Sequence, residues 1–256
     1  MPVVTLLAHT PQPEKLVAAA AKLCYSAADI DRLFSGLTDE KIADFLAMLT
    51  DLGHQSPLEH ASFTFGIEGV SRTLLAQITR HRIASFSVQS QRYVSQSDFE
   101  YVLPPAIAED EVAHAAFEES MREAGTAYNK LVDILHAGYT QKLEEAGKAT
   151  TVALKAAQKQ AFEDARFILP GASATKMILT MNARSLRGFF GQRCCNRAQW
   201  EIRGVAEEML ALCKEASPLL FLAAGPGCLR GPCPEGKMCC GKQEEVRQRF
   251  GSEQVG

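Results

Sequence analysis

The 256-residue sequence has no apolar run that approaches the roughly 20 residues needed to span a bilayer. Its first residues, Met1 to His9, lack the basic region that opens a signal peptide. We therefore expect a cytoplasmic protein that makes no membrane contact. The sequence also has no GxGxxG motif, which argues against the glycine-rich turn by which Rossmann folds hold dinucleotides.

Acidic residues are missing from two long stretches. Residues 69–97 contain four arginines and no Asp or Glu, and residues 165–200 contain six cationic residues and again no acid. The whole chain nevertheless has a formal net charge of −3, so the remaining residues are strongly acidic. Guanidinium groups bind phosphate through paired, charge-assisted hydrogen bonds. This segregation predicts a focused positive site for a phosphate-bearing ligand. Two solvated helix faces are the alternative, but such faces usually mix both signs.

The eight cysteines are unevenly distributed. Four lie in ordinary segments, where reduced thiols are the default for a cytoplasmic protein. The other four, Cys228, Cys233, Cys239 and Cys240, lie in a segment rich in Gly and Pro. No CxxC pair is present, and the spacing resembles a metal-binding knuckle only loosely. A flexible tail with free thiols, a disulfide and a metal-bound staple remain open as interpretations of this segment. We expect no metal in the functional site.

The hydrophobic pattern predicts an α+β fold, with an antiparallel sheet, packed helices and a helical lobe. Strands are expected over residues 3–8, around 63–67 and around 177–181, where apolar side chains alternate or form a short run. Helices are expected over residues 13–25, 38–52, 70–82 and 200–212, after Asn182, and in a run across about 106–169 that breaks near Gly138 and Gly147. We expect one domain over residues 1–222, including this lobe, followed by a Cys/Gly/Pro-rich tail over residues 223–256.

The stretch from Arg80 to Tyr93, RHRIASFSVQSQRY, carries the most information. Its RHR triplet, followed after seven residues by Ser90 and then by Arg92 and Tyr93, resembles the signature of flavin-dependent thymidylate synthases. The segment GHQSPLEH, residues 53–60, resembles that family's GHxxPxEH motif. The segments NARSL, from Asn182, and RAQWEI, from Arg197, resemble two further motifs. The likeness covers about residues 53–202, so the tail is predicted to lie outside the chemistry.

The resemblance implies an enzyme that converts dUMP to dTMP by reductive methylation. It implies 5,10-methylenetetrahydrofolate as the methylene donor, FAD as the redox cofactor and NADPH as the reductant. It also implies a homotetramer whose subunits share active sites, with small-molecule substrates and no nucleic-acid partner.

The resemblance also assigns roles to individual residues. The cofactor-binding residues that it implies are His54, Ser56, Arg80, His81, Arg82, Asn182, Arg184 and Gly188. The substrate-binding residues that it implies are Gln77, Arg80, Gln89, Ser90, Gln91, Arg92, Arg166 and Arg193. Arg193 is also the implied catalytic residue, because its charge favours a deprotonated or enolate-like uracil. Ser90 is not expected to act as a nucleophile, since its neighbours include no base.

Two positions depart from the family pattern. Ser87 and Val88 stand where many members have Asn-Glu, so that this position offers no carboxylate. Gly188 stands where Asn is often found beside the flavin adenine.

Two other functional classes compete with this interpretation. A nucleic-acid-binding module would use the basic stretches and lose affinity steeply with salt, but the acidic remainder and the few aromatics near the arginines argue against it. A helical structural protein with a metal-binding tail would leave both acid-free stretches unexplained.

Overall fold

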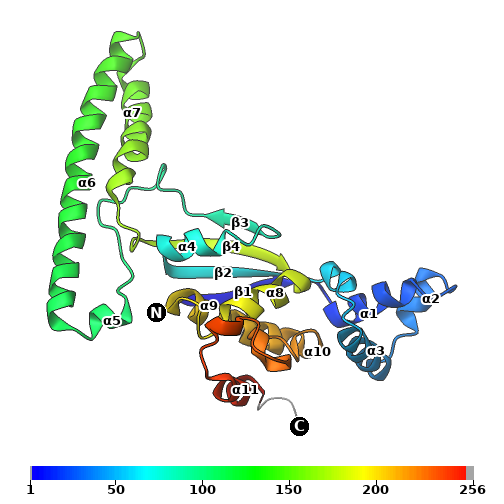
Figure 1. The fold of residues 1–256 in the computed structure, drawn as a ribbon. Helices are drawn as coiled ribbons and strands as arrows, with labels where there is room; N and C mark the ends of the chain where they lie inside the picture. Colours follow the sequence, from blue (N-terminus) through cyan, green and yellow to red (C-terminus); the bar gives the residue numbers. More distant parts are fainter. Residues whose placement is uncertain (1, 252–256) are drawn as a thin grey trace. The chain divides into compact units, whose positions relative to one another are not determined.

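The computed structural model describes residues 2–251, so Met1 and the last five residues of the expected tail lie outside the described part. Its sheet has the strand order β1-β2-β4-β3 (Figure 1). The strands are β1 (Val3–His9), β2 (Ser62–Ser71), β3 (Ser85–Val88) and β4 (Ala174–Asn182). This antiparallel sheet, together with the many helices, confirms the predicted α+β fold.

Backbone contacts divide the described chain into two compact units. The first unit comprises residues 69–76 and 88–177, and the second comprises residues 2–68, 77–87 and 178 onward. The helices of the first unit are α5 (Pro105–Ala108), α6 (Glu111–Glu145), α7 (Thr150–Ala165) and η2 (Arg166–Ile168). The helices of the second unit before its tail are α1 (Pro13–Leu23), α2 (Ile30–Ser35), α3 (Asp39–Asp51), η1 (Ser56–His60), α8 (Ala183–Arg193), α9 (Trp200–Ala216) and α10 (Pro218–Phe221).

The second unit is organised around the alternation that the sequence shows along β2. Phe63, Phe65 and Ile67 are fully buried, and β1 pairs with this strand in antiparallel register, from Val3 opposite Glu68 onward. Burying such side chains contributes roughly 1.5–3 kcal/mol each. The ring of Phe63 meets that of Phe221 edge-on at 5.1 Å, and Phe221 in turn meets Phe190. An aromatic cluster therefore fixes α8 and α10 against this strand.

The helical region of the first unit is a pair of long helices that lie side by side (Figure 1). Tyr128 of α6 is fully buried, and Phe162 and Ala165 of α7 complete its core cluster. The predicted break at Gly138 is wrong, because α6 runs through it for 35 residues. One glycine weakens a helix by only about 1 kcal/mol, which tertiary packing can offset. The break at Gly147 is confirmed, since this residue has a φ of +81°.

The segment around α4 (Arg72–Ile78) also differs from the prediction. A helix was expected from Val70 to about Arg82, but β2 continues to Ser71 and the helix ends at Ile78. The hydroxyl of Ser71 accepts a hydrogen bond from the backbone N–H of Leu74 at 3.0 Å, as an N-terminal cap does. Arg80 consequently lies in the turn after the helix rather than on its face.

The tail is folded through residue 251, so the flexible-tail interpretation is wrong over the described part. It contains η3 (Gly227–Arg230), η4 (Gly236–Met238) and α11 (Gln243–Gly251). Its buried residues are Ala224, Gly225, Pro226, Cys228 and Val246. The side chains of Gln243 and Arg247 both donate to the carbonyl oxygens of Cys228 and Gly231, and so tie α11 to η3.

All eight cysteines are unbridged, and within residues 2–251 no three side chains of His, Cys, Asp or Glu are placed to hold a metal ion. Within the same range, no helix has both the length and the apolar character needed to cross a membrane.

The buried Tyr128 generates a stability prediction. Its hydroxyl accepts a hydrogen bond from the backbone N–H of the buried Gln96 at 3.3 Å. Tyr128→Phe leaves that N–H without a partner, so we expect a loss of about 1–3 kcal/mol in the free energy of unfolding. Urea denaturation measures this, with Tyr139→Phe in the same helix as the control, because the Tyr139 hydroxyl donates to the carboxylate of Asp164 rather than to a buried backbone group. Equal losses in both variants would contradict the role of burial.

Candidate functional site

In the second unit, Arg193 and His81 bring two sequence motifs into contact. Arg193 is the last residue of α8, and its Nε donates a hydrogen bond to Nε2 of His81 at 3.2 Å. Phe189 lies four residues earlier on the same helix face, and its ring meets the His81 ring edge-on at 4.9 Å. One helix therefore holds the imidazole by both a polar and an aromatic contact.

Near this contact, the positive charges of Arg80 and Arg193 have no ion pair with a carboxylate among the described residues. Burial, and then the charge of Arg193, lower the pKa of His81. Burial, and then the charge of Arg80, lower the pKa of Arg193. Because Nε2 of His81 accepts a hydrogen bond, the ring is neutral and carries its proton on Nδ1. An anionic ligand beside Arg80 and Arg193 would relieve their repulsion, which is what a nucleotide or an enolate-like ring provides.

The start of α8 is fixed by residues from two other motifs. The side chain of Asn182 caps the helix by accepting from the N–H of Ser185 at 2.8 Å, as predicted. Arg184 forms an ion pair with the carboxylate of Glu59, although both side chains are about half exposed. Glu59 belongs to the GHQSPLEH segment and was not predicted to have a role. Its partner lies 125 residues away, so no local pattern could have revealed the pair.

The remaining predicted cofactor-binding residues of this unit are mostly exposed. His54 follows α3, and its backbone N–H donates to the carbonyl of Leu49, which closes that helix. Ser56 begins η1. Arg82 is exposed after α4, and a Cβ added at the exposed Gly188 would meet no atom within 4 Å. A ligand group can therefore reach the backbone at Gly188.

In the first unit, the predicted substrate-binding arginines converge on one turn of α7. Arg92 forms an ion pair with the carboxylate of Glu163 at 2.7 Å, and Nε of Arg166 donates to the Glu163 carbonyl at 3.1 Å. Burial, and then the charge of Arg166, lower the pKa of Arg72. Arg72 lies in the first acid-free stretch but was not among the predicted site residues, and Glu163 was not predicted either.

The segment from Gln89 to Arg92 forms a turn rich in donors. The hydroxyl of Ser90 accepts the backbone N–H of Arg92 at 3.2 Å, and Arg72 donates to the Gln89 carbonyl at 2.9 Å. Three buried side-chain nitrogens lack partners among the described residues: Arg72 Nε, Gln91 Nε2 and Arg92 Nε. Buried donors without acceptors are costly and call for an explanation. A bound phosphate would supply acceptor oxygens.

The predicted residues thus fall into two groups. The second unit holds His54, Ser56, Gln77, Arg80, His81, Arg82, Asn182, Arg184, Gly188 and Arg193, and the first holds Gln89, Ser90, Gln91, Arg92 and Arg166. In each group the arginines outnumber the carboxylates that pair with them, which are Glu59 in the second unit and Glu163 in the first. A nucleotide site requires such an excess of positive charge and of hydrogen-bond donors.

Residues 5–219 match the family described as "Thymidylate synthase complementing protein". The chain belongs to this family. All the motifs between residue 53 and residue 202 lie inside the region that matches the thymidylate synthase complementing family.

Similar proteins named "Flavin-dependent thymidylate synthase" agree with this assignment. The one from Clostridium tetani is 50% identical over 247 residues, which are 96% of each chain. The one from Geobacter sulfurreducens is 49% identical over 249 residues, covering 96% of this chain and 97% of the relative. The one from Pyrococcus horikoshii is 38% identical over 257 residues, covering 96% of each.

The lowered pKa of His81 generates a prediction about pH. An unfolded histidine titrates near pH 6.5, so as the pH falls the unfolded chain binds this proton before the folded chain does. The contribution of His81 to stability is therefore lost as the pH falls below about 6.5. Urea unfolding at pH values above and below 6.5 should show a steeper acid loss in the wild type than in His81→Gln. His136→Gln serves as the control. If the free energy of unfolding falls with pH as steeply in His81→Gln as in the wild type, His81 is not the residue that causes the loss.

Proposed function

We propose that this protein is a flavin-dependent thymidylate synthase, which converts dUMP to dTMP with 5,10-methylenetetrahydrofolate as the methylene donor, FAD as the cofactor and NADPH as the reductant. The observation that carries the proposal is the contact of Arg193 with His81, which joins the RHR motif to the end of the helix that begins with NARSL. Relatives bearing that name match 96% of the chain.

The residues of the second unit fit an FAD group. Two arginines whose charges repel each other, Arg80 and Arg193, stand beside a neutral imidazole, and backbone at Gly188 is open to a ligand. Arg80, His81 and Arg82 would border the flavin, and Asn182, Arg184, His54, Ser56 and Gly188 would hold other parts of the cofactor. The bound flavin supplies hydride chemistry to the site. Arg184 would exchange its exposed ion pair with Glu59 for a cofactor contact at little cost, because such surface pairs contribute at most about 1 kcal/mol.

The residues of the first unit fit the phosphate of dUMP. The unpartnered donors of Gln91 and Arg92, with Arg166 nearby, would bind phosphate oxygens as paired, charge-assisted hydrogen bonds. Ser90 would act as a hydrogen-bonding group rather than a nucleophile. Its hydroxyl is engaged by the backbone of Arg92, and no described histidine or carboxylate forms a hydrogen bond with it.

Arg193 has the geometry of a group that stabilises developing charge. Its Nε is committed to His81, which fixes the plane of the guanidinium and leaves its other N–H groups for a ligand. A guanidinium set in advance beside the uracil ring would stabilise negative charge there without reorganising during the reaction. Gln77 and Arg80, in the same unit, would complete the nucleotide contacts.

A homotetramer with shared sites also belongs to this proposal. Large apolar side chains remain exposed on the two long helices of the first unit, among them Val112, Ile134 and Val152, each more than half exposed. Burying them against other copies would favour assembly. Light scattering coupled to size-exclusion chromatography measures the subunit number directly.

The proposed function predicts a flavoprotein. The purified chain should absorb in the visible range as a flavin does, or acquire that absorption when FAD is added, and NADPH should bleach it. Addition of dUMP and methylenetetrahydrofolate should then produce dTMP. Failure to bind FAD under native conditions would reject the assignment.

The role of Arg193 generates a further prediction. Arg193→Ala should abolish dTMP formation while FAD remains bound, because a hydrogen bond to a charged group contributes about 1.5–3 kcal/mol and more where charge develops in a dry site. Arg193→Lys should restore little activity, since a point charge cannot reproduce a planar fork. Turnover and FAD titration are measured together, with the exposed Arg32→Ala as the control. Turnover near that of the wild type in either Arg193 variant would contradict the role.

A further inference from the structure

The tail forms one wall of a pocket beside α8. The pocket has a volume of about 220 Å³ and is lined by Gln55, Arg187, Gly188, Gly191, residues 223–227 and Arg230. A water molecule occupies about 30 Å³ in the liquid, so this space can hold a phosphate or diphosphate group. Every lining residue belongs to the second unit.

Arg187 and Arg230 line this pocket, and within residues 2–251 neither forms an ion pair with a carboxylate. Burial, and then the charge of Arg230, lower the pKa of Arg187 to about 10. Partial burial of the guanidinium likewise lowers the pKa of Arg230, although the residue as a whole is exposed. A carboxylate in contact would act in the opposite sense, and within the described chain no hydrogen bond or ion pair joins the Arg187 guanidinium to an acidic residue. A partly buried guanidinium without a carboxylate partner lowers the stability of the fold, and a bound anion would offset that loss.

The backbone around the arginines leaves room for such a partner. Gly188 and Gly191 are on the α8 side of the pocket, and a Cβ at Gly188 would meet nothing within 4 Å. Arg230 is held in place because its Nε and one terminal nitrogen donate to the Ala223 carbonyl, at 3.0 and 2.5 Å. Its remaining N–H group is available to a ligand, and η3, which carries Arg230, is tied down by α11.

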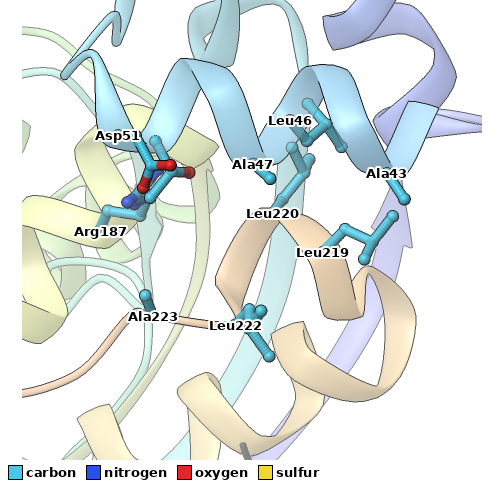
Figure 2. Close-up of a pocket in the computed structure, with 10 residues that line it drawn as sticks. Ala43, Leu46, Ala47, Asp51, Arg187, Leu219, Leu220, Leu222 and Ala223 are labelled. Carbon is cyan, nitrogen blue, oxygen red and sulfur yellow. The ribbon is translucent and has the colours of Figure 1, made fainter. Parts of the chain in front are cut away.

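An apolar pocket of about 170 Å³ adjoins the charged one and shares Arg187 and Ala223 with it. Figure 2 shows Leu46 and Ala47 of α3 facing Leu220 of α10, with Arg187 at the Asp51 end. Asp51 is exposed and forms no ion pair with Arg187 among the described contacts. The two pockets together offer an apolar surface next to an anion site, which matches the composition of a nucleotide.

We propose that Arg187 and Arg230 form a binding site for the phosphate groups of a nucleotide, with the tail as one of its walls. The inference rests on the proposed function for its ligand class, because FAD and NADPH both carry a diphosphate. Neither arginine belongs to the residues that the family motifs implied, and Arg230 lies beyond all of those motifs.

Inorganic pyrophosphate is the probe, titrated calorimetrically into the full-length protein with and without FAD. Arg187→Met and Arg230→Gln should each weaken its binding roughly tenfold or more, or remove one binding equivalent, because each deletes charged hydrogen bonds. Lys237→Gln removes the same charge from an exposed position in the tail and should bind as the wild type does. Arg187→Met should also raise the melting temperature of the ligand-free protein, because it removes an uncompensated charge.

The outcomes are decisive in either direction and need no turnover, so they do not depend on dTMP formation. Pyrophosphate that binds only the FAD-free protein would identify the FAD diphosphate as the occupant, and binding to the FAD-loaded protein would identify a second nucleotide. No binding to the wild type in either form would overturn the proposal. The proposal would also be overturned if Arg187→Met and Arg230→Gln both bound pyrophosphate as tightly as the wild type does. Circular dichroism confirms that each variant is folded.

Discussion

The hydrogen bond from Arg193 to His81 is the interaction on which the candidate site depends. It joins residues 112 positions apart and is possible because α8 begins and ends where it does. The cap by Asn182 fixes the start of that helix, and the aromatic contacts of Phe190 fix its face against the core. Burial, and then the charge of Arg193, lower the pKa of His81, so that two arginines approach each other beside an uncharged ring. The side chain of Arg193 therefore contributes both to the fold and to the candidate site.

Much of the fold was predictable from local rules. Alternating apolar residues located β2 and β4, and Thr38, Asn182 and the positive-φ residue Gly53 marked helix ends as expected. The errors arose where tertiary contacts outweigh local preference. Gly138 does not break α6, because packing against α7 stabilises the helix. The short β3 and α2 were not predicted, since four to six residues carry too little periodicity to be recognised.

The charges of the candidate site could likewise be predicted only in part from the sequence. The two acid-free stretches showed where cations gather along the sequence, but they could not show which of these cations have carboxylate partners. Glu163 and Glu59 supply such partners to Arg92 and Arg184 from distant segments. An ion pair between distant residues leaves no trace in local composition, so only the folded chain reveals which arginines are paired. By this criterion Arg72, Arg187 and Arg193 are charges that a ligand would stabilise, because burial and repulsion, rather than a carboxylate, lower their pKa values.

The lack of a carboxylate partner for Arg187 also bears on the role of the tail, which carries Arg230. A protein selected for stability alone would not bury Arg187 within reach of the charge of Arg230, since an apolar residue would serve the same packing better. A bound anion would offset this cost, and the tail holds the second arginine in place: α11 anchors η3 through four side-chain to backbone hydrogen bonds. A segment that motif matching left outside the chemistry is therefore better understood as part of a binding surface, whose specificity comes from charge that the fold alone does not neutralise.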